Sequence, residues 1–567
     1  MSTMSRRDLL AAAGVVAAAT AAACTREDEA ARLPADLPSR SLRLECGWIT
    51  KELGGRQVKL RAFNGTVPGP TITTRPGESL RITVKNSLPP YDSTGWPGNH
   101  NVPHALDATN LHLHGLDIAP HLFEPPGTAN PLAKMVHIGP GASFEYLFQL
   151  PADHPPGLYW YHPHLHGSTA VQAVSGMAGG VIVAGDIDEV PEVKAARDIP
   201  LIVQDIGLFP GATDADPWSY DFEQNAVWQT FTGNVTRYDP ATGTQQPTNL
   251  KSGFTTGDYP LRFFLLNGEP FYEEVHNRKV PTSPIGTQLG PAQIEVAPGE
   301  VVRFRMLNAC SDNLMPIVVE GHPMHLLALD GVNFPEVRVL PVYPAGTGEG
   351  QVRLSPANRA EFLIKASAAP GTYRILQLAQ RDQFLESAAK VIAELVVSGP
   401  AKDMALPTRL PLQKRYFPVD PDPPIANVRN IQFSGTFPPV VNPYVGIDFT
   451  INNNAYDEEA VPQVTALGST EIWHLEVFGQ HHGGSEGHPF HIHVNHFEPL
   501  TLTDNTDPKN PKATSYPPGT LLDTVWVPAR SVVTIRMRFK EWTGKAVYHC
   551  HILPHEDTGM MQNFLIT

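Results

Sequence analysis

Residues 156–164 of the chain read PGLYWYHPH, and the same pattern returns as PGTYRILQL at 370–378 and as TGKAVYHCH at 543–551. Each stretch is a turn containing glycine, followed by a short run rich in apolar and aromatic residues. This combination is typical of a β-strand that begins at a tight turn. Its return at wide intervals predicts three structural units of one kind.

A second repeat lies upstream of the first in each unit. It reads PGESLRITVKN at 76–86, PGEVVRFRMLN at 298–308 and, more loosely, GSTEIW at 468–473. The alternation of apolar and polar residues predicts a half-buried strand. Each unit therefore contains a pair of corresponding strands, one from each repeat.

The length and composition agree with an all-β chain. A chain of 567 residues is too long for one hydrophobic core, and about three domains are expected. Proline accounts for 56 residues, about twice its usual frequency, which favours turns and short strands over long helices. We expect three consecutive β-sandwiches, with boundaries near residues 190 and 400.

The charge and the cysteine count exclude several classes of protein. A formal net charge of −15 and a pI near 5.8 argue against a nucleic-acid partner and against an anionic membrane surface. The four cysteines, Cys24, Cys46, Cys310 and Cys550, are too few for a disulfide framework. A bond between Cys46 and Cys310 stays open from the sequence.

The first 24 residues are interpreted as an export signal. SRRDLL at 5–10 is a twin-arginine signature, and the apolar run Leu9–Ala23 is too short to span a membrane permanently. We therefore expect the twin-arginine export machinery as a partner, a periplasmic or extracellular location and no transmembrane span in the mature protein. Cys24 is either a lipid-anchored N-terminus or lies near a simple cleavage site. Residues 25–40 are expected to form a linker.

Four His-x-His pairs predict a metal cluster. Alternate residues of a strand project from one face, so two imidazoles at this spacing can reach a shared cluster. Zinc is satisfied by three or four ligands, so eight imidazoles imply several metals, and neutral imidazole suits copper. The eight histidines are His112, His114, His162, His164, His491, His493, His549 and His551.

A second metal site follows from the same strand period. Cys550 faces away from His549 and His551, and His488 is out of phase with His491 and His493. A cysteine, two histidines and a weak methionine ligand are the set used by blue-copper electron-transfer sites. The predicted set is Cys550, His488, His555 and, axially, Met560. An electron at Cys550 then has a covalent path through His549 and His551 into the cluster.

The middle unit has lost the metal pattern. HPMHLL at 322–327 resembles HPFHIH at 488–493, but Leu327 replaces the third histidine, and Gln377 stands in the place of the cysteine. We predict that this unit is structural and holds no copper.

Four segments resemble the signature segments of multicopper oxidases: HLHG at 112–115, HPHLHG at 162–167, HPFHIH at 488–493 and HCHILPHEDTGMM at 549–561. The resemblance runs from about residue 40 to the end and is in the style of bacterial laccases and cuprous oxidases. It implies an all-β fold of three cupredoxin-like Greek-key sandwiches. The implied domains are 41–190, 191–400 and 401–567.

The resemblance also implies four copper ions with assigned ligands. Type 1 copper would be bound by His488, Cys550, His555 and Met560, and type 2 copper by His112 and His491. The type 3 pair would be bound by His114, His162, His164, His493, His549 and His551.

Such an enzyme takes single electrons from a reductant and reduces dioxygen to water, which consumes four protons. A carboxylate relay near the cluster is therefore expected. Glu556 is the first candidate, with Glu124 and Asp117 as weaker ones, and Glu486 could orient a donor at the type 1 site.

The favoured function is a laccase-like oxidase of phenolic or other aromatic reductants. A cuprous oxidase for copper tolerance is the alternative, although only 11 methionines exist and none cluster outside Met560-Met561. A copper-free structural or cell-division protein of the same fold is disfavoured because every ligand is present. A copper nitrite reductase is disfavoured by the third unit and the eight histidines. The oligomeric state cannot be read from the sequence.

Overall fold

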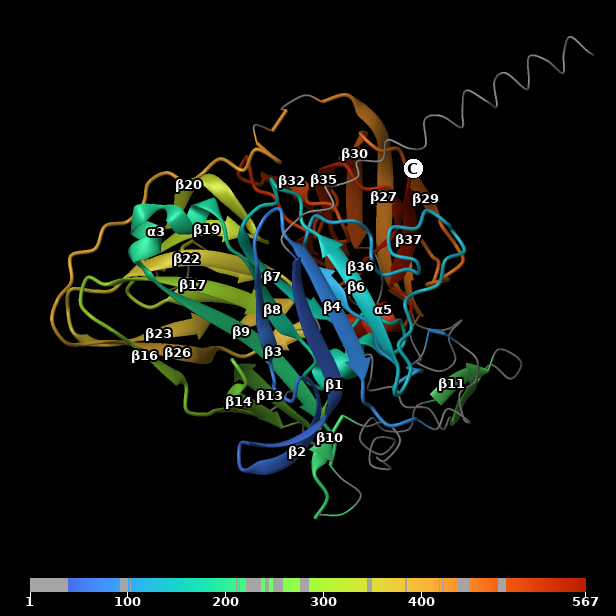
Figure 1. Cartoon of the computed structure of the whole chain (residues 1–567), viewed down its shortest axis with the longest axis horizontal. Helices are drawn as coiled ribbons and strands as arrows, with labels where there is room; N and C mark the ends of the chain where they lie inside the picture. Colours follow the sequence, from blue (N-terminus) through green and yellow to red (C-terminus); the bar gives the residue numbers. More distant parts are fainter. Residues whose placement is uncertain are drawn as a thin grey trace, which may run out of the picture. The chain divides into compact units, whose positions relative to one another are not determined.

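The regular secondary structure of the described residues is nearly all β-strand, as the turns and prolines of the sequence predict (Figure 1). The helical segments among the described residues are short, with α2 at Thr169–Val174, η1 at Asp186–Glu189, α3 at Pro191–Ala195 and α5 at Leu553–Asp557. Within the described residues, no helix has the length and apolar character needed to cross a membrane. The computed structural model describes residues 39–91, 100–101, 103–210, 213, 215–220, 236–239, 244–247, 259–275, 285–343, 349–382, 385–417, 419–420, 423–436, 448–477 and 486–567.

Two sheets form the first part of the fold. One has the order β10-β2-β1-β4-β6 and the other β3-β8-β7-β5. Their strands are β1 (Ser39–Leu53), β2 (Arg56–Phe63), β3 (Gly69–Thr74), β4 (Ser79–Asn86), β5 (His112–His114), β6 (Ser143–Gln149), β7 (Gly157–His162), β8 (Gly179–Val183) and β10 (Trp218–Ser219). β10 joins the first sheet from beyond the predicted boundary at residue 190, so that boundary remains a prediction.

The middle part contains a larger sheet pair. The orders are β15-β14-β13-β9-β17-β22-β19-β20 and β16-β26-β23-β18-β21. The strands of the first sheet are β9 (Arg197–Leu208), β13 (Leu261–Leu266), β14 (Glu269–Val275), β15 (Ile285–Gln288), β17 (Val301–Asn308), β19 (Met324–Leu329), β20 (Val332–Leu340) and β22 (Arg359–Lys365). Those of the second are β16 (Ala292–Val296), β18 (Met315–Val319), β21 (Val352–Leu354), β23 (Gly371–Gln377) and β26 (Lys390–Val397). Two small hairpins, β11 (Thr236–Asp239) with β12 (Thr244–Pro247) and β24 (Gln380–Asp382) with β25 (Leu385–Ser387), stand apart from these sheets.

The last part repeats the arrangement. Its sheets have the orders β28-β27-β30-β35-β32-β33 and β29-β37-β36-β31-β34. The strands are β27 (Ile425–Thr436), β28 (Asp448–Ile451), β29 (Gln463–Thr465), β30 (Thr470–Val477), β31 (His488–Ile492), β32 (Phe497–Asp504), β33 (Lys512–Ser515), β34 (Thr524–Val527), β35 (Ser531–Arg538), β36 (Gly544–Cys550) and β37 (Met561–Ile566). Each of the three sheet pairs encloses its own large apolar core.

The two sequence repeats occupy corresponding strands. The first repeat forms β7, β23 and β36, and the second forms β4, β17 and β30, one copy in each sheet pair. β4 and β30 alternate buried and half-buried residues, as their pattern predicts. β17 is buried throughout because Arg303 and Arg305, on its polar face, pair with Glu361 and Asp188 at 2.5–3.0 Å. The all-β prediction is confirmed.

Close contacts join residues that are far apart in the sequence. Gly157 approaches Gly331 so closely that a Cβ on Gly157 would lie 2.5 Å from the Gly331 carbonyl oxygen. The Tyr159 hydroxyl donates to the same oxygen at 3.0 Å. Arg359 of β22, fully buried, binds Asp523 through two hydrogen bonds of 2.9 and 2.6 Å. A residue of the middle unit thus supports the loop that precedes β34.

The cysteines of the described residues are free. Cys46 lies in the core of the first sheet pair, and Cys310 in that of the middle pair. Cys46 and Cys310 therefore do not form the disulfide that the sequence allowed. Cys24 and the predicted export signal lie outside the described residues.

Candidate metal centre

Paired strands bring the four His-x-His motifs face to face. β5 and β7 run antiparallel with His112 opposite His162, and β31 and β36 run antiparallel with His491 opposite His549. Each pair of strands therefore presents its imidazoles together, as strand alternation predicts.

The histidines of the first and last sheet pairs meet. The His112 ring stacks on His493, and the His114 ring stacks on His491, each with ring centres 3.9 Å apart. His551 lies 5.1 Å from His114 between ring centres. Three overlapping groups have ligand atoms within 4.8 Å of one another: His112, His114 and His162; His112, His491 and His493; and His164, His493 and His549. All eight predicted imidazoles thus come together.

The chemistry of this cluster fits bound metal. Several buried ring nitrogens have no hydrogen-bond partner in the described structure, a costly state unless something binds them. They include His112 Nε2, His114 Nδ1, His162 Nε2, His491 Nε2 and both ring nitrogens of His551. Burial lowers the pKa of His162 to about 3 and that of His549 to about 4. The rings are therefore neutral near pH 7 and offer lone pairs, which suit copper.

Backbone carbonyls orient several of these rings. Nδ1 of His162 lies 2.8 Å from the carbonyl oxygen of Pro163, Nδ1 of His549 lies 3.0 Å from that of Cys550, and Nδ1 of His491 lies 2.9 Å from that of Asp523. A carbonyl only accepts, so each Nδ1 carries the proton and each Nε2 is left as a lone pair.

The second site forms on the same strands. Nδ1 of His488 lies 3.4 Å from Cys550 Sγ, Nδ1 of His555 lies 3.8 Å from it, and the two nitrogens are 3.4 Å apart. All three side chains are buried, and Met560 packs in the same core as Cys550. Burial raises the pKa of the Cys550 thiol, so a thiolate here needs a bound cation.

Aromatic rings and one acid border the second site. Phe449 stacks on His555 with ring centres 4.0 Å apart, and Phe433 stacks near His488 at 5.8 Å. Glu486 Oε1 lies 3.5 Å from His555 Nε2. Glu486 thus lies beside a histidine of this site, and its role in orienting an electron donor stays a prediction.

The three carboxylates predicted as proton relays differ in their distance from the cluster. Glu556 is fully buried, with Oε1 3.3 Å from His164 Nδ1 and Oε2 3.1 Å from His549 Nδ1. Burial and the neighbouring Asp557 raise its pKa. Asp117 instead binds Arg415 at 2.5 Å, and Glu124 is exposed. Glu556 alone of the three touches the cluster.

Three other histidines contact polar groups outside the predicted ligand set. His496 Nε2 lies 2.9 Å from the Asp330 carbonyl oxygen, His166 Nε2 lies 3.1 Å from Asn101 Oδ1, and His474 Nδ1 lies 3.0 Å from Thr534 Oγ1. His481 and His482 lie outside the described residues.

The histidines of the middle unit lie away from the cluster, and the absence of copper from this unit stays a prediction. His322 Nε2 accepts the Ser367 N–H at 2.9 Å, and His322 Nδ1 donates to the Glu320 carbonyl oxygen at 2.6 Å. His322 and His325 take part in none of the clustered ligand groups found among the described residues.

Three residues around the histidine cluster were not predicted from the sequence. His121 contacts His112, Asp523 Oδ1 lies 3.2 Å from His114 Nε2, and Arg359 neutralises Asp523. None belongs to a recurring motif. Their positions become visible only in the folded structure, where distant strands pair and the middle unit contacts the last unit.

Three segments match sequence models of multicopper oxidases, at residues 46–187, 238–394 and 419–567. The chain is 25% identical to a laccase of Bacillus stratosphericus over 89% of this chain and 90% of that one. It is 24% identical to the multicopper oxidase MmcO of Mycobacterium tuberculosis over 97% and 90%. A multicopper oxidase structure from Campylobacter jejuni, described as a metallo-oxidase, matches with a TM-score of 0.65 at 22% identity, covering 94% and 92%.

The fold and the matched segments define a copper-dependent oxidase of three related β-units. The chain belongs to the multicopper oxidase family and is laccase-like. It couples the oxidation of a reducing substrate to the reduction of dioxygen, and copper is its cofactor.

Proposed function

We propose that this oxidase holds four copper ions in the two sites just described. Type 1 copper takes His488, Cys550, His555 and Met560. Type 2 copper takes His112 and His491, and the type 3 pair takes His114, His162, His164, His493, His549 and His551. The supporting observation is the convergence of eight buried imidazoles, six of which have an unpartnered ring nitrogen in the described structure, next to a separate group of one cysteine and two histidines.

When bound, copper at the Cys550 site supplies one-electron oxidation, and the cluster supplies four-electron reduction of dioxygen. The protein holds the two sites at a fixed separation. His549 and His551 are bonded in sequence to Cys550, so one strand end links both sites covalently. Complete burial of these three side chains keeps water away from that link.

Glu556 is proposed as the proton relay. Its two carboxylate oxygens approach the outer nitrogens of His164 and His549 at 3.3 and 3.1 Å. A carboxyl in this position can hold a proton within reach of the cluster. We expect Glu556→Gln to lower turnover about 100-fold while leaving the copper count at four. Unchanged turnover with excess substrate would remove Glu556 from the mechanism.

We propose phenols or other aromatic reductants as substrates. The scarcity of methionine, with 11 residues in the chain, disfavours a surface that gathers cuprous ion. The deciding experiment is a copper count and a visible spectrum, followed by oxygen uptake with a phenol and with Cu(I) in parallel. Four coppers and an intense thiolate-to-copper band are expected, with faster uptake on the phenol. Faster uptake on Cu(I) would reverse the choice of substrate, and a colourless, copper-free protein would overturn the proposal.

We also propose domains 41–190, 191–400 and 401–567, and export of the folded protein through the twin-arginine pathway to the periplasm or the extracellular space. Three separate cores support the division, and the SRRDLL sequence at 5–10 supports the route. Replacing Arg6 and Arg7 by lysine should retain the protein in the cytoplasm, as cell fractionation would measure. Continued export of that variant would rule out this route.

A further inference from the structure

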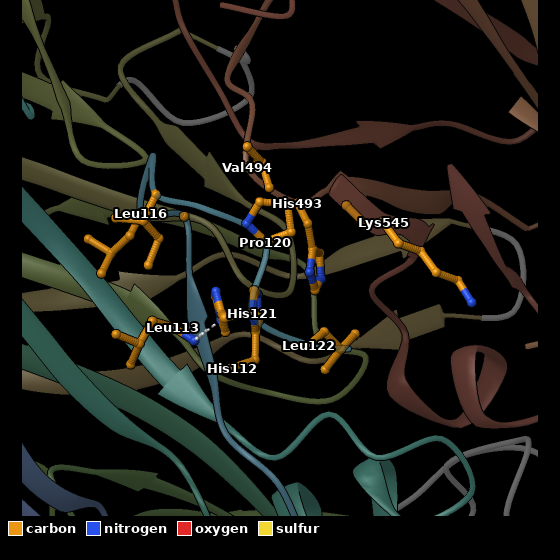
Figure 2. A pocket seen from close by; sticks show the side chains of 12 residues that line it. His112, Leu113, Leu116, Pro120, His121, Leu122, His493, Val494 and Lys545 are labelled. Atoms are coloured by element: carbon orange, nitrogen blue, oxygen red, sulfur yellow. Dashed lines mark hydrogen bonds between the residues drawn. The ribbon is translucent and has the colours of Figure 1, made fainter. Parts of the chain in front are cut away.

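One histidine outside the predicted ligand set lies against the cluster. His121 is buried nine residues beyond His112, and its ring stacks beside His112 with ring centres 5.2 Å apart. Both residues line a small recess of about 10 Å³, together with His493 and Lys545. Figure 2 shows the His121 ring between the strand that carries His112 and the chain that carries Pro120 and Leu122.

The hydrogen bonds of His121 fix where its proton lies. The backbone N–H of Leu113 lies 3.1 Å from His121 Nε2 (Figure 2). A backbone N–H can only donate, so Nε2 of His121 accepts and carries no proton. The proton is then on Nδ1, which lies 3.4 Å from the Ala119 carbonyl oxygen.

The proton of His112 follows from this assignment. His112 Nδ1 lies 3.2 Å from the same His121 Nε2. Because His121 Nε2 accepts, His112 Nδ1 must donate. The neutral His112 ring then presents Nε2 as a lone pair, and that nitrogen has no other partner in the described structure.

We propose that His121 is a positioning residue that holds His112 in the tautomer and orientation required of a type 2 copper ligand. This proposal rests on the proposed function, since it takes His112 as a ligand. Three other cluster histidines, His162, His491 and His549, are oriented by backbone carbonyls. At His112 a side chain performs this task, so the support can be removed by mutation without changing the backbone.

The test compares two substitutions at one position. His121→Leu removes the acceptor, whereas His121→Gln keeps an amide oxygen at about the reach of Nε2. Partners of metal-bound histidines are worth about 10- to 100-fold in metal affinity. We expect His121→Leu to lose one copper per chain on dialysis and to lose the type 2 signal in electron paramagnetic resonance. The thiolate-to-copper band should keep its intensity, and His121→Gln should restore the missing copper.

A matched control exists at His154. Its Nε2 also accepts a backbone N–H, that of Asp117 at 3.1 Å, and its side chain is buried too, but it contacts none of the proposed ligands in the described structure. His154→Leu should keep all four coppers and an unchanged type 2 signal. If His121→Leu does not fold, His121→Asn replaces it, since the shorter amide cannot reach the place of Nε2.

Each outcome bears on one claim. Four coppers and an unchanged type 2 signal in His121→Leu, or in its Asn substitute, would overturn the role of His121. The same would follow if His154→Leu lost the same copper, because the loss would then reflect general destabilisation. A native protein without a type 2 signal would instead overturn the proposed function.

Discussion

Replacing Arg359 by leucine should destabilise the copper-free protein strongly. The Arg359 side chain is fully buried, and that of Asp523 is 2% exposed. Their guanidinium and carboxylate groups form two hydrogen bonds of 2.9 and 2.6 Å. Burial alone raises the pKa of Asp523, but Arg359, together with His491 and His496, outweighs this effect and keeps the pKa low. Without Arg359 a buried carboxylate loses its counter-charge, which costs about 3–5 kcal/mol.

The measurement is urea unfolding of the metal-free protein at pH 7, followed by tryptophan fluorescence. Adding Asp523→Asn to Arg359→Leu removes the isolated charge. We expect the double variant to recover about half of the lost free energy of unfolding, since double-mutant coupling between contacting residues reaches about 0.5–3 kcal/mol.

The control is an exposed pair of the same geometry. Arg374 binds Glu320 through hydrogen bonds of 3.0 and 2.7 Å, and their side chains are 49% and 40% exposed. Arg374→Leu should cost less than about 1 kcal/mol. If Arg359→Leu cost no more than Arg374→Leu, the reasoning from burial would be wrong.

Three further changes test other parts of the structure. Cys550→Ser should abolish the intense visible band and the oxidase activity and lower the copper count from four to three; an intact band would contradict the type 1 assignment. Burial lowers the pKa of His154 to about 4 from its ordinary value of 6.5, so its contribution to stability is present above about pH 6.5 and is lost as the pH falls through 4. The variant His154→Gln should therefore flatten the acid side of the curve of unfolding free energy against pH by up to about 3 kcal/mol, and an unchanged slope would disprove this origin. Gly331 has a φ of +82° and faces the Tyr159 ring, so Gly331→Ala should cost about 2–4 kcal/mol in urea unfolding; a neutral effect would refute the tight contact.

Much of the site could be predicted from the sequence because its ligands follow the two-residue periodicity of β-strands. His112 and His114, like His549 and His551, stand two positions apart, and the period of two fixes which side chains share a face. The convergence of the eight histidines was also predicted, since four His-x-His pairs indicate a shared metal cluster. These predictions needed no knowledge of how distant segments pack.

The residues that contact the ligands from outside the motifs could not be predicted from strand periodicity. His121 reaches His112 through a loop with no periodicity, and Asp523 lies at the end of a loop before β34. Arg359 belongs to a unit that carries no ligand of its own, so nothing in its local sequence points to the cluster. Contacts of this kind depend on the docking of whole sheets, which the local pattern does not encode.

The division of the cluster between the first and last sheet pairs determines when it can assemble. Residues 112–164 leave the ribosome long before residues 491–551. The first four histidines of the cluster are therefore made well before the other four. Metal that arrives early finds only half of its ligands. The complete copper cluster can therefore form only after the last strands have closed against the first.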